Sequence, residues 1–296
     1  YSDAATGTAD TASVAVNMTT ADGELGTITV ANVETLTVSA SGGFDATYAV
    51  TADAATTLTL NAAADSTAAD TDAGTVVATA ELVTTLNINA SNDLTISDNT
   101  NKLIKVSEVN IDSAVADKTV TLTGLTTTAT ASTADAVVIN VTGAGDVAAS
   151  VDTSFGTYNA TTNADSVTLA ASDSTGDITY TTSASAANSV TTGSGNDTVI
   201  LGAAADQYDS IDMGAGTNTL QVSVANSAST TTSTSGAFYD ASATTDPTIA
   251  NVTVAEYDMD GGSSNIAQGK ITLDVTDAEE LTNTISINDG DLIDMD

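Results

Sequence analysis

Apolar residues alternate with threonine, serine and asparagine along almost the whole chain, and this period of two constrains the fold more than any other feature. Segments such as GTITVANVETLTVSA (26–40), TTLTLNA (56–62) and TTLNINA (84–90) place every second side chain on one face. Such alternation predicts short β-strands with one buried face. Only ATAELVTTL (78–86) and DAEEL (277–281) are expected to turn briefly helical. We therefore predict an all-β chain.

The composition narrows the kind of β structure. Hydrophobic residues make up 41% of the 296 residues but aromatic residues only 3%, so Val, Ile, Leu, Ala and Thr must build the core. β-Branched side chains pack well on a pleated surface. Polar steps followed by alternating strands recur at irregular spacing, as in NVETLTV (32–38) and NADSVTL (163–169). Units this thin must stack on neighbours, which predicts an elongated β-solenoid or β-sandwich array; chance similarity within a Thr-rich β protein is the alternative.

The length exceeds that of most single domains and predicts either several units or one elongated array. We divide the chain into an N-terminal β-strand array (1–135), a β-helical segment (136–225), a low-complexity Ser/Thr/Ala linker (226–247) and a C-terminal β unit (248–296). The chain opens at Tyr1 without a basic and apolar signal segment. We therefore expect either a piece of a longer polypeptide or a route of export without such a signal.

The side chains that are missing exclude most catalytic chemistry. The chain has no histidine, cysteine or tryptophan, so Ser-His-Asp and Cys-His systems, His-ligated zinc and thiol redox pairs all lack their parts. We expect no enzyme. The remaining enzymatic alternative is a pair of acids acting on a glycosidic bond, as in a hydrolase or lyase on a β-helix.

Charge excludes two classes of partner and suggests a third. The chain has 39 acidic residues against four lysines, a formal charge of −35, which repels nucleic-acid phosphate and anionic membrane surfaces. No apolar run is long enough to insert into a membrane. Only seven of the acids are Glu, and the prevailing Asp favours turns and calcium coordination. Two explanations stay open: solubility in a salty medium, or binding of divalent cations.

The stretch TTGSGNDTVILG (191–202) carries the strongest local signal. Gly193 and Gly195 permit a tight turn with successive carbonyls on one side, and Asp197 adds a carboxylate, which gives the all-oxygen shell that calcium prefers. The β-formers that follow lead into a parallel strand. The spacing matches the nonapeptide G-G-x-G-x-D-x-U-x of calcium-binding β-helices, with Thr192 in place of the first glycine.

Weaker copies and acidic turns supply the other candidate metal ligands. GAGTNTLQV (214–222) has Asn where the Asp should be, 21 residues after Asp197, and TGAGDVAAS (142–150) is one residue short. A D-x-D-G turn near the C-terminal end lacks the distant Glu of an EF-hand, so that family is excluded. For each turn the alternative is a solvated loop. The candidates are Gly214, Gly216 and Asn218, then Gly143, Gly145 and Asp146, and finally Asp258, Asp260, Asp289 and Asp291.

These nonapeptides, the Thr/Ala/Ser/Asp-rich strands and the acidic balance together resemble a bacterial surface-layer protein of the repeats-in-toxin class. The resemblance implies type I secretion, β-solenoid or β-sandwich segments with Ca²⁺ at their turns, and a calcium-dependent lattice on the cell exterior. The implied partners are other copies of the chain, with cell-surface polysaccharide contacted through regions outside it. The alternative is a segment of a large repeats-in-toxin adhesin that binds a ligand on a cell or other surface.

Overall fold

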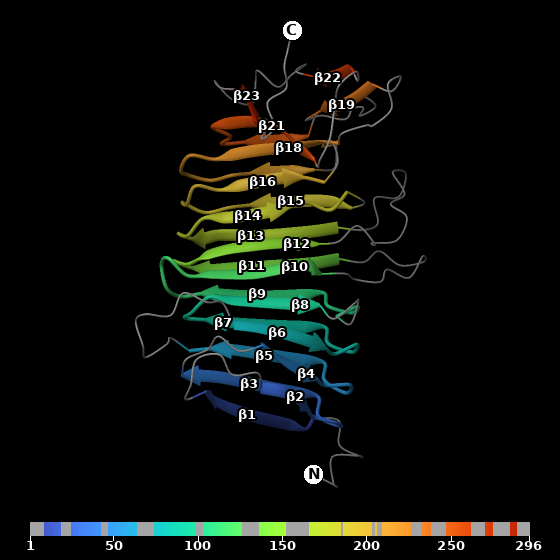
Figure 1. Ribbon diagram of the computed structural model, residues 1–296, viewed down its shortest axis with the longest axis vertical. Coiled ribbons are helices and arrows are strands. Elements are labelled where there is room, and N and C mark those ends of the chain that lie inside the picture. The colour runs from blue at the N-terminus through green and yellow to red at the C-terminus, as the bar shows by residue number, and fades with distance from the viewer. Residues whose placement is uncertain are drawn as a thin grey trace.

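The computed structural model describes residues 9–18, 25–42, 47–63, 74–98, 103–125, 136–151, 166–184, 186–202, 205, 209–225, 233–237, 247–261, 270–274 and 285–288. Every regular element among them is a β-strand, which confirms the all-β prediction (Figure 1). None of these residues forms a helix with the length and apolarity that spanning a bilayer requires.

The strands form two long sheets and one short pair. The first sheet contains, in spatial order, β1 (Thr11–Met18), β3 (Thr35–Gly42), β5 (Thr57–Ala62), β7 (Thr85–Ala90), β9 (Glu108–Ser113), β11 (Ala136–Gly143), β13 (Ser166–Ser174), β15 (Ala187–Thr191), β17 (Ser210–Asp212) and β20 (Thr248–Ala250). The second contains β2 (Leu25–Thr29), β4 (Thr47–Thr51), β6 (Gly74–Thr79), β8 (Leu94–Asp98), β10 (Thr119–Leu125), β12 (Asp146–Val151), β14 (Ile178–Thr181), β16 (Thr198–Leu201), β18 (Thr219–Ala225), β21 (Val254–Gly261) and β23 (Ile285–Asn288). The short pair is β19 (Ser233–Ala237) with β22 (Lys270–Asp274).

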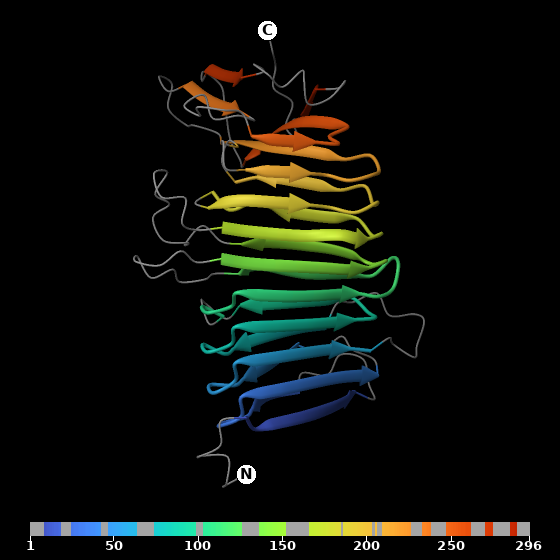
Figure 2. The ribbon, with the colours of Figure 1, turned by 180° about the vertical axis from the view of Figure 1, so that it is seen from behind.

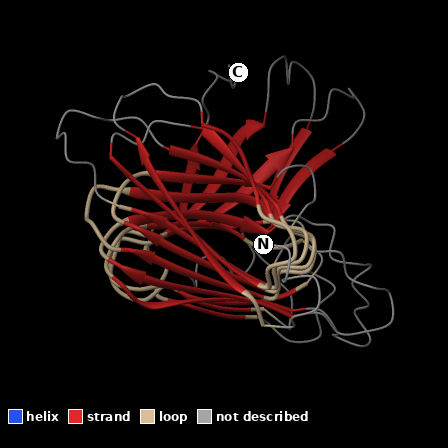
Figure 3. Ribbon diagram, turned by 90° about the horizontal axis from the view of Figure 1, so that it is seen from below, coloured by secondary structure: helices blue, strands red, loops and turns tan. Residues whose placement is uncertain are grey.

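The chain passes from one sheet to the other and back, so that each coil adds one strand to each sheet (Figures 1 and 2). Neighbouring strands within a sheet are parallel, as between β5 and β7, where Thr57 pairs with Thr85 and Ala62 with Ala90. Seen along the stack, the loops gather at the two sides of the facing sheets (Figure 3). This arrangement is a two-sheet parallel β-solenoid.

The prediction of a brief helix over 78–86 is wrong. These residues finish β6, turn, and begin β7. The apolar spacing that suggested a helix arises because Val83 is buried in the turn while Ala78, Ala80 and Leu86 point inward from the turn and the flanking strands. The second segment, 277–281, lies outside the described residues.

The core is a set of apolar rows that run along the solenoid, since parallel pairing places equivalent residues of successive coils on top of one another. Each fully buried leucine or isoleucine contributes roughly 1.5–3 kcal/mol. The central row of the first sheet is Leu36, Leu58, Leu86, Val109, Ile139, Leu169, Val190 and Ile211. The facing row is Tyr48, Val76, Ile96, Leu122, Ala149, Tyr180, Val199 and Leu220.

Strand pairing continues on both sides of the boundary predicted at 135/136. β9 pairs with β11, and β10 pairs with β12. The segment 226–247 contains β19, and β18 pairs directly with β21 beyond it. The division into four units stays a prediction.

Candidate functional site

The stretch 191–202 comprises the end of β15, the turn 192–197 and β16. Turns of this kind stack on one another along one side of the solenoid. Their glycines form a column: a Cβ added to Gly176 would collide with the carbonyl oxygen of Gly145, one on Gly195 with that of Gly176, and one on Gly216 with that of Gly195. Gly195 itself does not adopt a positive φ. At Gly195 the close approach of the neighbouring coil, and not unusual backbone angles, requires glycine. Gly176 was not among the glycines predicted from the sequence.

A second column in the same turns holds carboxylate and amide side chains. Asp146 Oδ1 accepts a 2.9 Å hydrogen bond from the backbone N–H of Asp177. Asp177 Oδ1 accepts a 2.6 Å hydrogen bond from the backbone N–H of Asn196. Asn196 Oδ1 then accepts a 3.0 Å bond from the N–H of Thr217. Each side chain therefore satisfies the backbone of the next coil. This role of Asp146 requires no metal.

The residues singled out as nonapeptide ligands, Asp197 and Asn218, lie one coil apart at equivalent positions, so the 21-residue offset corresponds to one turn of the solenoid. Asp197 Oδ1 accepts a 2.9 Å bond from the N–H of Ile178, and Asn218 Oδ1 accepts a 3.0 Å bond from the N–H of Asp197. Asn218 Nδ2 also donates to the carbonyls of Met213 and Asn251, at 2.6 and 3.1 Å. Asn218 is thus fully engaged with backbone.

Asp197 differs from Asn218 in having one oxygen without a partner. Its side chain is buried, with 1% exposed, and Oδ2 has no hydrogen-bond donor among the described residues. Burial raises the pKa of Asp197, and the charge of Asp177 raises it further; the Thr192 hydroxyl and the Ile178 N–H act in the opposite direction. The Thr192 hydroxyl lies near the carboxyl, yet Thr192 Oγ1 makes no hydrogen bond of acceptable geometry with any described residue.

These orphaned oxygens are compatible with a cation in the turn. Ser174 Oγ, in the preceding coil, is a third buried oxygen without a partner in the described residues. Carboxylate and hydroxyl oxygens are ligands that Ca²⁺ accepts, and buried oxygens without donors call for water or an ion. Calcium takes six to eight oxygens, so turn carbonyls or water would have to complete the shell. The described part of the chain contains no group of three or more acidic side chains placed to hold a metal.

The remaining predicted ligands are placed as follows. Gly143 (φ 106°), Gly214 (φ 62°) and Gly216 (φ 113°) occupy the left-handed region that favours glycine, while Gly193 packs on the carbonyl of Ser174. Gly193 also accepts a 2.9 Å bond from Ala215 through its carbonyl, so this carbonyl stacks the coils. Asp258 and Asp260 lie in β21, where the structure describes the backbone alone, and Asp289 and Asp291 lie outside the described residues. Calcium binding by all of these residues stays a prediction.

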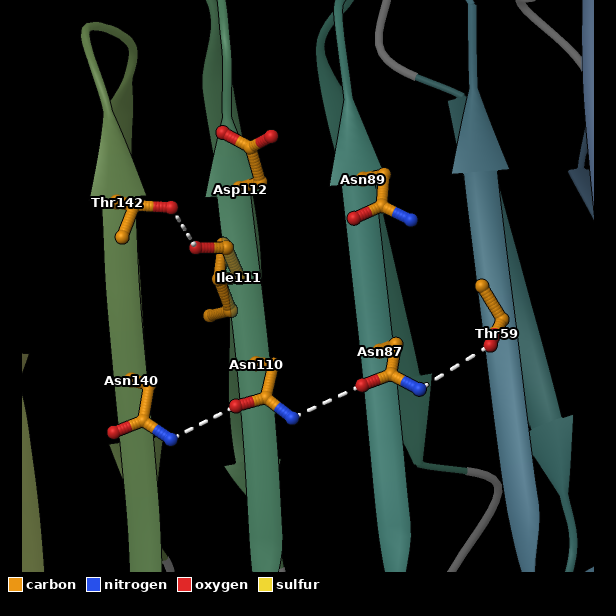
Figure 4. Close-up of a pocket in the computed structure, with 8 residues that line it drawn as sticks. All are labelled: Thr59, Asn87, Asn89, Asn110, Ile111, Asp112, Asn140 and Thr142. Carbon is orange, nitrogen blue, oxygen red and sulfur yellow. Dashed lines mark hydrogen bonds between the residues drawn. The ribbon is translucent and has the colours of Figure 1, made fainter.

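A polar surface on the outside of the first sheet was missed altogether (Figure 4). A row of three amides and one hydroxyl crosses four strands: Asn87 donates to Thr59 Oγ1 (3.2 Å), Asn110 to Asn87 Oδ1 (3.0 Å) and Asn140 to Asn110 Oδ1 (2.8 Å). Two positions further along each strand runs a second row, and a shallow open hollow of about 390 Å³ lies along the two rows. We call this hollow the amide trough; it is lined by Thr59, Asn87, Asn89, Asn110, Ile111, Asp112, Asn140 and Thr142.

Comparison with models of protein families, with curated proteins and with solved structures gives no match. The resemblance to surface-layer proteins of the repeats-in-toxin class therefore depends on motif and composition alone.

Proposed function

We propose that the chain is a structural subunit of an extracellular surface layer or filament, whose copies assemble with one another in the presence of calcium. The observation that carries this proposal is the stacking of parallel strands in both sheets. Because each coil repeats at about 4.8 Å, the outer faces present rows of small polar side chains at a fixed interval. A rigid body with repeating faces suits lateral packing into a lattice.

The second sheet illustrates such a face. One outward position is occupied by threonine in most coils, and parallel pairing aligns these residues along the solenoid. The row consists of Thr47, Thr75, Thr95, Thr121, Thr179, Thr198 and Thr219, with Ala148 between the fourth and fifth. Threonine loses little conformational freedom on burial in a contact because its χ1 is already restricted.

Calcium would neutralise part of the negative charge of the chain. Copies that each carry −35 repel one another, so assembly requires the carboxylates to be neutralised. In the turn 191–202, Asp197 and Thr192 would hold the ion, which is where the orphaned oxygens lie. A bound Ca²⁺ supplies positive charge to a buried carboxylate and stabilises the folded chain by mass action. The chain would then be less stable without calcium, and its assembly can wait until it reaches a calcium-rich exterior.

Negative-stain electron microscopy and sedimentation velocity test this proposal on the purified chain. We expect sheets or filaments in millimolar CaCl₂ that dissolve on addition of EGTA. NaCl at the same ionic strength is the control, and it should not replace calcium, since screening alone leaves the orphaned oxygens without an ion. Particles that stay single in calcium would contradict self-assembly and favour the adhesin alternative.

A further inference from the structure

The amide trough contains residues that its strands do not favour. Asparagine is depleted in β-strands, yet five asparagines point outward from the middle or end of β5, β7, β9 and β11. Outside these strands the first row carries Thr37, Ala170 and Thr191, and the second carries Ser39 and Asp173, so neither row has an asparagine there. The departure from strand preference is therefore local, and such departures are expected at functional sites. The five residues are Asn61, Asn87, Asn89, Asn110 and Asn140.

The bonds between these amides fix their orientation without using all their hydrogen-bonding capacity. An amide has two N–H donors and two acceptor lone pairs. Asn87 donates once and Asn140 donates once, and no described residue donates to Asn140 Oδ1. In the second row Asn89 donates to Asn61 Oδ1 at 2.7 Å, and its own Oδ1 likewise lacks a described donor. The unused N–H and C=O groups form an oriented array that faces out of the sheet.

We propose that the amide trough binds a linear neutral polysaccharide that lies along the solenoid axis. Sugar hydroxyls both donate and accept, so they pair with amides that offer an N–H beside a C=O. Because successive coils lie about 4.8 Å apart, a polymer parallel to the axis meets one hydrogen-bonding side chain of each row at every step. The trough extends over three coil spacings, from β5 to β11. This length is about 14 Å, which is enough for a few sugar units. The pre-set orientation of the amides lowers the cost of binding.

Other occupants fit the trough less well. Glu108 and Asp112 lie beside the amides and, with the charge of the whole chain, oppose a polyanion such as nucleic acid. A peptide strand would need an open sheet edge, whereas the trough lies on a face. A second copy would bring an equally hollow face and the same acids against it. This inference is independent of self-assembly.

Native electrophoresis through gels that contain a soluble polysaccharide tests the inference on the full chain, in EGTA so that assembly does not interfere. The probes are hydroxyethylcellulose, dextran and a galactomannan, with alginate as the anionic comparison. The test variant replaces Asn87, Asn110 and Asn140 by Thr, which suits the strands and removes the amides. The matched control is Asn17→Thr, an exposed strand asparagine on β1 outside the trough.

We expect at least one neutral polysaccharide to retard the native chain and Asn17→Thr equally, and the triple variant to lose roughly tenfold or more in affinity. Its melting temperature should not fall, which separates lost binding from lost folding. Equal retardation of the triple variant, or no retardation of the native chain by any neutral probe, would overturn the inference. Loss of calcium-induced assembly in the triple variant, with native mobility unchanged by every polysaccharide, would identify the face as a contact between copies and would also overturn it.

Discussion

The backbone N–H of Asp197 donates a 3.0 Å hydrogen bond to Oδ1 of Asn218, which occupies the same position one coil further along. Asn218 Nδ2 donates to the carbonyl of Met213, five residues earlier. The residue five before Asp197 is Thr192, and an ionised carboxylate has no hydrogen to donate there. Asp197 thus adds a buried charge at a position where asparagine is internally satisfied, and a cation or a proton is what it lacks.

Replacing Asp197 by Asn should stabilise the chain when calcium is absent. The amide keeps the acceptor for Ile178, removes the buried charge and can donate within the turn, so we expect a gain of roughly 1 kcal/mol in unfolding free energy. Urea denaturation in EGTA at neutral pH measures it. Asp197→Ala is the control and should lose about 1–3 kcal/mol because the Ile178 N–H loses its acceptor. An Asn variant less stable than the native chain would contradict this account of the turn.

Calcium should raise the melting temperature of the native chain more than that of Asp197→Asn. A ligand bound by the folded state alone stabilises it in proportion to the logarithm of its concentration over Kd. Differential scanning calorimetry across a calcium series gives both slopes. Asp112→Asn, an exposed carboxylate on the outer face, is the control and should behave as the native chain. Identical slopes for the native chain and Asp197→Asn would remove Asp197 from the set of calcium ligands.

The stabilities of the native chain and of Asp197→Asn should depend differently on pH, because the pKa of Asp197 is raised in the folded chain. An acid whose pKa is higher in the folded state binds its proton more tightly there. Its contribution therefore favours folding at acidic pH and is lost as the pH rises from the ordinary value of 3.8 through the raised one. In EGTA, the native chain should lose stability relative to Asp197→Asn as the pH rises above 3.8. A difference that is flat or of opposite sign would show that the carboxyl is not desolvated.

Gly195→Ala should destabilise the stacked turns. The new Cβ would meet the carbonyl of Gly176, which is backbone and cannot move aside independently, so we expect a loss of about 1–3 kcal/mol or more. Gly26→Ala is the matched control, since nothing lies within 4 Å of its Cβ, and it should change stability by no more than about 0.5 kcal/mol. Thermal denaturation of both variants makes the comparison. Equal effects at the two positions would contradict close stacking as the reason for the glycine column.

The period of two was enough to predict the strands and their buried faces, because side-chain direction in a strand depends on parity alone. It could not predict which strands pair. The row of Thr59, Asn87, Asn110 and Asn140 joins residues separated by 28, 23 and 30 positions, and loops of unequal length set these separations. The alignment of these side chains into the amide trough could therefore not be predicted. The one signal in the sequence is that TLTLNA and TLNINA each end an alternating run in Asn-Ala.

The turns were predicted only in part, because the sequence does not show which coils lie next to one another. A search for G-x-G-x-D finds 193–197 but misses the coil before it, where Ser174 stands at the first glycine position and Gly176 precedes Asp177 directly. Gly176 is nevertheless essential to the column because Gly145 and Gly195 pack on its two sides. Asp146 and Asp197 both accept a backbone hydrogen bond, and the pattern could not show that Asp197 alone of the two is buried with its second oxygen lacking a described partner. That difference depends on which coil lies next to each.

Tyr180→Phe should leave the fold intact and make it slightly more stable. Tyr180 is fully buried, and its Oη has no partner among the described residues, so the hydroxyl costs desolvation without a compensating bond. The expected gain is at most roughly 1 kcal/mol, whereas Tyr180→Ala should lose about 3–5 kcal/mol through the cavity it leaves. Ala149, its neighbour in the preceding coil, makes room for the ring, so Ala149→Leu should cost about 1–3 kcal/mol. Urea denaturation of the three variants tests the packing, and a Phe variant that loses more than about 1 kcal/mol would show that the hydroxyl is bonded in the folded chain.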